Sequence, residues 1–253
     1  MKRDHSPLNP LDSLADPWAS LPGGKHLRRQ IESVIRLRLP AVFGFHHISI
    51  GPFAHHLNIG CSRTRNHFRI DQQRGDLHAQ SDALPLQTDS VDVVTLPLTL
   101  DFCAHPHDVL REVNRVLIGD GNLILIGLNP WSLWGARRLL WRRHQLPWNG
   151  RFLSAARIKD WLHLLGFDIQ VQVFSEFRLP VKSPTLLRRF EFVERWGKRH
   201  QPPVGALYII VAQKRVWPLT PTRLQKRRLL QVPILNVGRL PRSEVNSRES
   251  QKQ

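Results

Sequence analysis

The hydrophobic pattern over residues 44–215 alternates between short apolar runs and stretches with helical periodicity. Residues 91–96 are rich in β-branched side chains and predict a strand. Pro106 suits the first position of a helix, and the apolar residues that follow it share one helical face. These residues are Val109, Leu110, Val113, Val116 and Leu117. The continuous apolar run 122–127 predicts a second strand that is covered on both faces, which completes a βαβ unit.

The same alternation continues through the rest of the region. Gly119 is expected to end the first helix in a left-handed conformation, with a turn at 120–121. Ser154 is expected to cap a second helix that ends at Gly166. The other predicted elements are strands at 47–51, 66–71, 76–80, 168–177 and 207–212 and a helix at 186–197. The prediction therefore contains seven strands.

Strands that alternate with helices favour an α/β fold with a mainly parallel sheet and helices on both faces. We expect this domain to span residues 25–215, after an N-terminal extension at 1–24. Residues 216–253 are expected to form a basic, disordered tail. The stretch 214–253 holds ten Lys or Arg residues against two Glu, together with four Pro, and shows little apolar periodicity.

The net charge of +17 and the isoelectric point near 11.4 favour anionic partners. No apolar run is long enough to cross a bilayer or to serve as a signal peptide. The two cysteines, Cys61 and Cys103, lack the spacing of a zinc site or a disulfide framework. We therefore expect a cytoplasmic protein.

Two stretches of the predicted βαβ unit carry a family pattern. Residues 82–94 read Asp-Ala-Leu-Pro-Leu-Gln-Thr-Asp-Ser-Val-Asp-Val-Val, and residues 110–117 read Leu-Arg-Glu-Val-Asn-Arg-Val-Leu. They are similar to the stretches "D-A-x-x-L-P-F-x-D-x-S-F-D-x-V" and "L-x-E-x-x-R-V-L-x-P-G-G" of class I S-adenosylmethionine-dependent methyltransferases of type 11. Residues 119–121, Gly-Asp-Gly, stand where that group has Pro-Gly-Gly. The stretch 127–135, Gly-Leu-Asn-Pro-Trp-Ser-Leu-Trp-Gly, resembles a bacterial branch of this group.

The resemblance implies a Rossmann-like, seven-stranded sheet with an antiparallel last strand. It also implies S-adenosylmethionine as cofactor, bound at the carboxyl ends of the strands. Matched position by position, Asp82 would accept a hydrogen bond from the adenine amino group, and Ala83 would offer a backbone N–H beside it. Leu96 and Leu98 would flank the methyl donor.

The first loop of that family is rich in glycine, which lets the backbone approach the amino-acid end of the donor. Here the corresponding stretch 48–54 reads Ile-Ser-Ile-Gly-Pro-Phe-Ala and retains only Gly51. Asp71 lies twenty residues after Gly51, the usual spacing of an acidic residue that holds a ribose, and is our candidate for that role. A second register, 57–62 (Leu-Asn-Ile-Gly-Cys-Ser), leaves too few residues before Asp71 for a helix and ranks second. In either register the donor pocket departs from the family pattern.

Asp101 and His105 follow the strand predicted at 91–96 and are candidate general bases for the methyl acceptor. Their structural alternatives are a loop carboxylate and a helix-capping histidine. The stretch 129–131, Asn-Pro-Trp, resembles a motif of amino methyltransferases, but it follows the fifth strand instead of the fourth, which favours a structural turn. Four histidines between positions 46 and 56 lack a convincing further ligand, so we expect no metal.

Residues 131–144 predict a basic amphipathic helix. It would be either a docked helix with a solvated basic side or a lid that contacts an anion or a membrane surface. Together with the tail, it offers a surface to nucleic acid or another anionic partner. The function indicated is methyl transfer to an unidentified acceptor. The alternative is a catalytically inactive module of the same fold that binds an anionic partner.

Overall fold

The computed structural model describes residues 11, 14, 16–38, 43–58, 63–140, 148–177 and 202–216. The helix predicted at 186–197 and nearly all of the predicted basic tail lie outside these residues. The elements in chain order are η1 (Pro17–Ser20), α1 (Gly24–Arg38), β1 (Phe43–Ile50), β2 (Arg63–Asp71), β3 (Leu77–His78), β4 (Val91–Pro97), α2 (Thr99–Phe102), α3 (Pro106–Val116), β5 (Leu117–Leu128), α4 (Leu133–Leu140), α5 (Ala155–Leu164), β6 (Phe167–Ser175) and β7 (Leu207–Lys214). None of the described helices is long and apolar enough to cross a bilayer.

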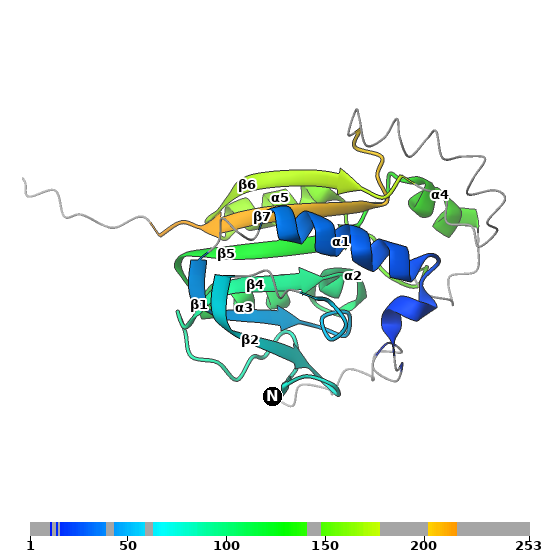
Figure 1. Cartoon of the computed structure of the whole chain (residues 1–253). Helices are drawn as coiled ribbons and strands as arrows, with labels where there is room; N and C mark the ends of the chain where they lie inside the picture. Colours follow the sequence, from blue (N-terminus) through cyan, green and yellow to red (C-terminus); the bar gives the residue numbers. More distant parts are fainter. Residues whose placement is uncertain are drawn as a thin grey trace, which may run out of the picture. The chain divides into compact units, whose positions relative to one another are not determined.

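All seven predicted strands are present and form one sheet in the order β3-β2-β1-β4-β5-β7-β6. The pairs from β3 to β5 are parallel, whereas β7 is antiparallel to both β5 and β6. This topology confirms the Rossmann-like α/β fold with an antiparallel last strand. The parallel strands end at one side of the sheet, which we call the carboxyl edge, and α4 lies beyond that edge (Figure 1).

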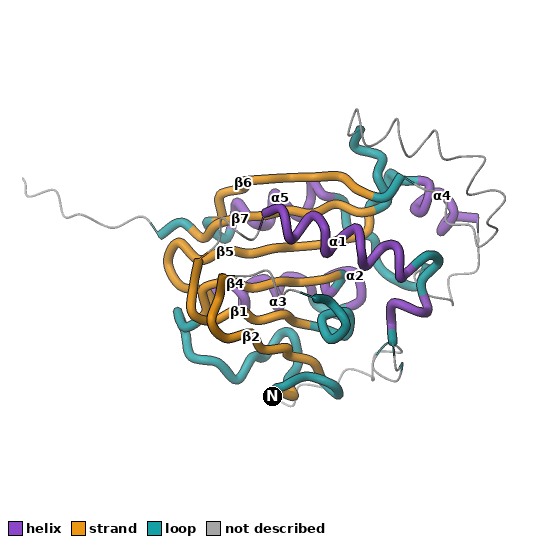
Figure 2. Tube along the Cα trace, viewed as in Figure 1, coloured by secondary structure: helices purple, strands orange, loops and turns teal. Residues whose placement is uncertain are grey.

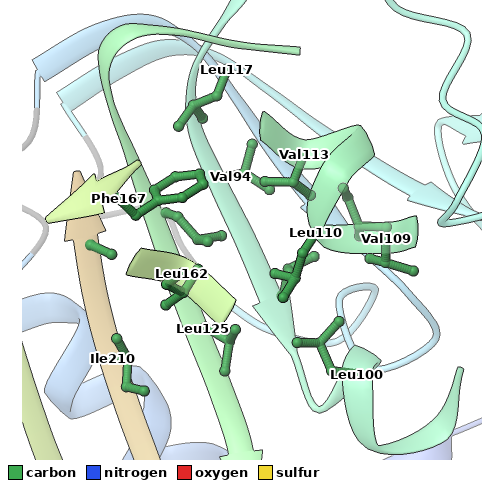
Figure 3. Close-up of a cluster of buried hydrophobic side chains, with 14 of the residues drawn as sticks. Val94, Leu100, Val109, Leu110, Val113, Leu117, Leu125, Leu162, Phe167 and Ile210 are labelled. Carbon is green, nitrogen blue, oxygen red and sulfur yellow. The ribbon is translucent and has the colours of Figure 1, made fainter. Parts of the chain in front are cut away.

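Helices cover both faces of the sheet between β4 and β6. Helix α1 crosses one face over β5 and β7, and α3 and α5 lie on the other (Figures 1 and 2). Along β5, Ile124 and Ile126 belong to the core beneath α1, whereas Leu123 and Leu125 belong to the core beneath α3 and α5. Figure 3 shows this second core, in which the apolar stripe of α3 meets Leu125 and side chains of α5 and β7.

Helix α1 and the chain before it were not anticipated as parts of the core. Leu27, Ile31 and Ile35 recur every four residues and are fully buried on one side of α1. Leu11 and Trp18 are also fully buried in the same cluster. Part of the stretch predicted as an N-terminal extension therefore packs against the sheet.

The end of α3 differs from the prediction. The helix ends at Val116 and β5 begins at the next residue, so Gly119 lies within a strand. Asp120, not Gly119, takes the left-handed conformation, with a φ of 64°. Lys214 Nζ donates to the carbonyls of Asn114 and Leu117, at 2.8 and 2.7 Å, and satisfies acceptors at this helix end. The other helix was predicted correctly: the Ser154 hydroxyl accepts the N–H of Arg157, and Gly166 follows with a φ of 82°.

The half of the sheet formed by β1, β2 and β3 carries fewer helices. The described residues between β1 and β2, 51–58, form turns, and only 72–76 connect β2 to β3. His47 on β1 and Thr95 on the adjoining β4 are fully buried, with His47 Nε2 2.9 Å from Thr95 Oγ1. The ring of His67 on β2 lies 4.6 Å from that of His47, between centroids and tilted by 46°, and His67 Nε2 lies 3.1 Å from Ser49 Oγ. A row of polar groups therefore lies within this part of the sheet.

Candidate functional site

The ends of β1 and β2 meet at the carboxyl edge, as the predicted donor site requires. The N–H of Gly51 donates to the carbonyl of Ile70 at 2.8 Å, which places Gly51 beside Asp71. Gly51 has a φ of 102°, and a Cβ there would lie 2.7 Å from Thr99 Oγ1, so both its backbone and its surroundings require glycine. Thr99 Oγ1 in turn donates to the carbonyl of Ile50 at 2.6 Å.

Asp71 ends β2 and is 7% exposed. Its backbone carbonyl accepts the N–H of Ala79 at 3.2 Å. Within the described part of the chain its carboxylate takes no hydrogen bond and no ion pair. Although the residue is largely buried, its carboxylate oxygens reach solvent, so this side chain is suited to accept hydrogen bonds from a ligand at the carboxyl edge.

Asp82 is half-buried in a turn closed by a bridge between Gln80 and Ala83. Among the described residues its carboxylate likewise has no hydrogen-bond or ion-pair partner. The N–H of Ala83 donates to the carbonyl of Gln80 at 3.1 Å. The turn therefore already uses the donor that we had assigned to the adenine.

A pair of charged residues on α3 holds the segment that follows Asp82. Glu112 Oε1 accepts the N–H of Leu84 at 2.9 Å, and Arg115 donates to the carbonyl of Leu84 at 3.2 Å and to Thr88 Oγ1 at 3.1 Å. Glu112 and Arg115 also contact each other at 2.7 Å. The two family-like stretches are thus one structural unit. The signal in the sequence was a Glu and an Arg three residues apart, outside the apolar stripe of α3.

The loop after β1 is packed into the core. Phe53 is fully buried, with its ring 5.0 Å from that of Trp18 in an edge-to-face arrangement and 5.5 Å from that of Phe102. Trp18 Nε1 donates to the carbonyl of Phe53 at 3.0 Å. A phenyl group held from η1 and α2 therefore fills space where the family has glycines.

Leu96 and Leu98, predicted to flank the donor, are both fully buried. They belong to different cores, Leu96 to the one beneath α3 and Leu98 to the one beneath α1. Leu98 takes a left-handed conformation with a φ of 55°, and its N–H donates to the carbonyl of Ile126 at 2.9 Å. Because neither side chain is exposed, the structure does not place them in contact with a ligand at the carboxyl edge.

Asp101 is buried in α2 and connects three segments. Its Oδ2 accepts the N–H of Leu128 at 2.9 Å, its Oδ1 accepts that of Leu153 at 3.3 Å, and its carbonyl accepts that of Arg151 at 2.7 Å. Burial raises the pKa of Asp101 to about 7, against the lowering effect of the two backbone donors and of Arg138. Burial, and next to it the Asp101 charge, raises the pKa of Cys103 to about 12. Both carboxylate oxygens are thus occupied by backbone N–H groups.

His105 is exposed at the residue before α3, and its side chain makes no capping hydrogen bond. A second histidine, His26 in the first turn of α1, was not singled out from the sequence. Its Nε2 lies 3.2 Å from Oε2 of Glu176, which is buried just after β6 and has a φ of 57°. This pair joins residues 150 positions apart, which no local pattern can indicate. Among the described residues, no three His, Cys, Asp or Glu side chains gather into a metal site.

The stretch after β5 forms a structural turn. Asn129 Nδ2 donates to the carbonyls of Pro203 and Gly205, both at 2.9 Å, and its Oδ1 accepts the N–H of Trp131 at 3.1 Å. The Asn129 amide is therefore fully used in holding the chain, as the turn interpretation expected. In α4 the two basic residues are docked: Arg137 lies over the ring of Trp148 and Arg138 over that of Phe152.

A family model described as a methyltransferase domain matches residues 57–125. The uncharacterized protein YafS of Escherichia coli K12 is 34% identical over 215 residues, which cover 81% of this chain and 83% of the relative. This chain belongs to the YafS family, and its residues 57–125 match a methyltransferase domain. S-adenosylmethionine is the cofactor that a methyltransferase domain of this type implies.

Solved structures share the fold at low sequence identity. One is a chain of the Haloferax volcanii complex that contains the methyltransferase activator Trm112. It has a TM-score of 0.56 and 16% identity, and the alignment covers 77% of this chain and 92% of that one. Another is a Thermotoga maritima S-adenosylmethionine-dependent methyltransferase, described as a possible histamine N-methyltransferase. It has a TM-score of 0.53 and 21% identity, with coverages of 74% and 89%.

The residues present fit the nucleoside end of S-adenosylmethionine better than its amino-acid end. Asp71 and Asp82 offer two carboxylates without other partners at the carboxyl edge. At the amino-acid end, Phe53 and its aromatic neighbours replace the open glycine loop. The family match begins at Leu57, in the register ranked second, whereas the first strand of the sheet ends at Ile50. The arrangement of strands therefore supports the register with Gly51.

Proposed function

We propose that the chain transfers a methyl group from S-adenosylmethionine to a nucleophilic acceptor, and that Asp71 and Asp82 hold the nucleoside of the donor. The observation that carries this proposal is the unpartnered, solvent-accessible carboxylate of the largely buried Asp71, where β2 ends beside Gly51. A carboxylate in this position is suited to accept hydrogen bonds from vicinal ribose hydroxyls. Asp82 is suited to accept one from an exocyclic amine.

The filled loop after β1 changes how the donor binds. Glycines would expose backbone N–H groups to the amino-acid end, but Pro52 has no N–H and Phe53 is packed on Trp18. We therefore propose that the nucleoside end supplies most of the binding free energy. Adenosine should then bind within about tenfold of S-adenosylhomocysteine, a difference of about 1.4 kcal/mol.

The chemistry asks little of the protein beyond alignment of the acceptor with the methyl group and exclusion of water. Asp101 has both oxygens engaged by backbone donors, so we assign no proton transfer to it. His105 keeps a side chain free of capping contacts and is the sequence candidate that we retain as a base. A nucleic-acid or other anionic acceptor stays a prediction from the charge of the chain.

Calorimetric titration with S-adenosylhomocysteine tests the donor site. Asp71→Asn keeps the shape of the side chain and removes its charge. We expect it to weaken binding by tenfold or more, a loss of about 1.4 kcal/mol or greater. Asp82→Asn should weaken binding by a smaller factor. The control is Asp160→Asn on α5, the same substitution at an exposed carboxylate remote from the carboxyl ends of β1 and β2.

Equal affinity in the Asp71 variant and the Asp160 control would remove Asp71 from the site. No binding by the unmodified protein at millimolar ligand would contradict the donor assignment as a whole. Melting temperatures of the three variants, measured in parallel, separate loss of the ligand contact from loss of the fold.

A further inference from the structure

Three large apolar side chains are exposed together at the carboxyl edge of the molecule. Trp131 is 78% exposed, and Leu133 and Val204 are each 47% exposed. Trp131 and Leu133 stand at the start of α4, and Val204 lies three residues before β7. We call these three residues the Trp131 patch. Single exposed apolar residues are ordinary, but a group of them at one place marks an interaction surface.

The patch rests on a rigid support. The buried side chain of Asn129 binds the backbone on both sides of Val204 and also the N–H of Trp131. The hydroxyl of Ser132 donates to the carbonyl of Asn129 at 2.6 Å and accepts the N–H of Gly135 at 3.2 Å. The exposed side chains are thus presented by a network of hydrogen bonds whose polar groups are satisfied, instead of by a loose loop.

The chain around the patch is strongly basic. Residues 121–167 contain seven Lys or Arg and a single acidic residue, Asp160. Arg137 and Arg138 follow Leu133 within the same helix, with their guanidinium groups over aromatic rings. Across the whole chain the net charge is +17. The segment that carries Trp131 and Leu133 is therefore basic in composition and complements an anionic surface.

An apolar group within a basic environment fits a phospholipid membrane better than it fits a nucleic acid. An indole ring prefers the interfacial layer of a bilayer, and aliphatic side chains gain free energy on leaving water for acyl chains. Basic residues near the surface are attracted to anionic headgroups. Nucleobases would stack on Trp131, but Leu133 and Val204 offer them neither an aromatic face nor a hydrogen bond.

We propose that the Trp131 patch docks on anionic phospholipid membranes, with the three apolar side chains in the interfacial layer and the basic residues around them near the headgroups. Because α4 lies beyond the carboxyl edge (Figure 1), docking would turn that edge toward the membrane. The proposal does not depend on methyl transfer, because it is based only on the exposed apolar patch and the basic charge of the chain.

Co-sedimentation of the full chain with large unilamellar vesicles tests the proposal. The vesicles are pure phosphatidylcholine, or phosphatidylcholine with about one third phosphatidylglycerol. We expect binding to the anionic vesicles, weaker binding in high salt, and little binding to the neutral ones. The variant W131S/L133S should bind the anionic vesicles about tenfold more weakly or worse. Val204→Ser should weaken binding less, because it removes less apolar surface.

The matched control is Leu164→Ser, which removes an 84% exposed leucine at the far end of α5. It should bind as the unmodified chain does. Equal binding by W131S/L133S and the control would overturn the proposal, as would absence of binding to anionic vesicles. Binding to single-stranded RNA, lost in W131S/L133S, without binding to vesicles would overturn it in favour of a nucleic-acid surface. Melting temperatures close to that of the unmodified chain show that the variants are folded.

Discussion

The two halves of the sheet are built differently. From β4 to β6, helices cover both faces, and the central strands β5 and β7 contribute long buried apolar runs. From β1 to β3, the described linkers are turns, and a row of polar groups runs from Thr95 on the adjoining β4 through the buried His47 of β1 to the half-buried His67 of β2. Both candidate donor carboxylates, Asp71 and Asp82, nevertheless belong to the second half.

The contrast indicates that the two halves have different roles: one is mainly a packed core, and the other carries the polar groups of the proposed donor site. In the helix-covered half, apolar packing accounts for the buried residues of β5, α3 and α5. In the other half, a core formed by Trp18, Phe53 and Phe102 takes the place of a helix after β1, while unpartnered carboxylates remain at the strand ends. The loop after β1 thus differs from the glycine-rich loop of the family, whereas acidic residues remain at the proposed donor site.

The largest expected effect comes from truncating the core of the helix-covered half. Leu125→Ala removes a fully buried side chain between β5 and the helices α3 and α5 (Figure 3). We expect a loss of about 3 kcal/mol in the free energy of unfolding, because helices on that side prevent collapse of the cavity. Chemical denaturation at neutral pH measures it.

The matched variant in the other half is Ile70→Ala, equally buried on β2. Its neighbours Phe68 and Leu77 are partly exposed, so the site can relax, and we expect a loss of about 1–2 kcal/mol. Equal losses in the two variants would show that the halves are packed alike and would remove the contrast.

Sequence reasoning was reliable where structure is local. The apolar stripe of α3, the Ser154 cap and the run of β5 are all encoded within a few residues, and all three were predicted. The fold followed, because strands alternating with helices at this spacing admit few topologies. The spacing from Gly51 to Asp71 also placed two donor-site candidates at neighbouring strand ends.

Interactions between distant residues were not predictable. Trp18 meets Phe53 across 35 positions, and Asp101 receives an N–H from Leu153 across 52. Nothing in the local pattern tells a buried, bonded carboxylate from a catalytic one. The α1 helix was missed because Leu27, Ile31 and Ile35 are separated by charged residues, and its apolar face becomes evident only against the sheet.

A second test concerns the buried carboxyl group of Asp101, in the helix-covered half. Asp101→Asn leaves one acceptor for two backbone donors, those of Leu128 and Leu153, and should cost about 2 kcal/mol at pH 5. The pKa of Asp101 is raised to about 7 in the folded protein, so its favourable contribution is fully present below its unfolded pKa, near 3.8. That contribution is lost as the pH rises through about 7.

The stability difference between the unmodified chain and the Asn variant should therefore shrink between pH 5 and pH 8. Urea denaturation of both proteins across this pH range measures the difference. Subtracting one plot of unfolding free energy against pH from the other cancels the contributions of all other titrating groups. A difference that grows with pH would show that Asp101 is held ionised by its backbone donors.

The smallest expected effect concerns the polar row of the helix-poor half, and it has the opposite dependence on pH. Burial, with a smaller contribution from His67, lowers the pKa of His47 to about 3. Its contribution is present above its unfolded pKa, near 6.5, and is lost as the pH falls toward 3. His47→Gln keeps a group able to bond Thr95 and should cost about 1 kcal/mol at pH 7. The cost should vanish near pH 6 and change sign by pH 5, because the buried histidine must exclude a proton there and glutamine need not. A cost that persists at pH 5 would mean that His47 accepts a proton within the fold, and the polar row would then be a charged site instead of a neutral core.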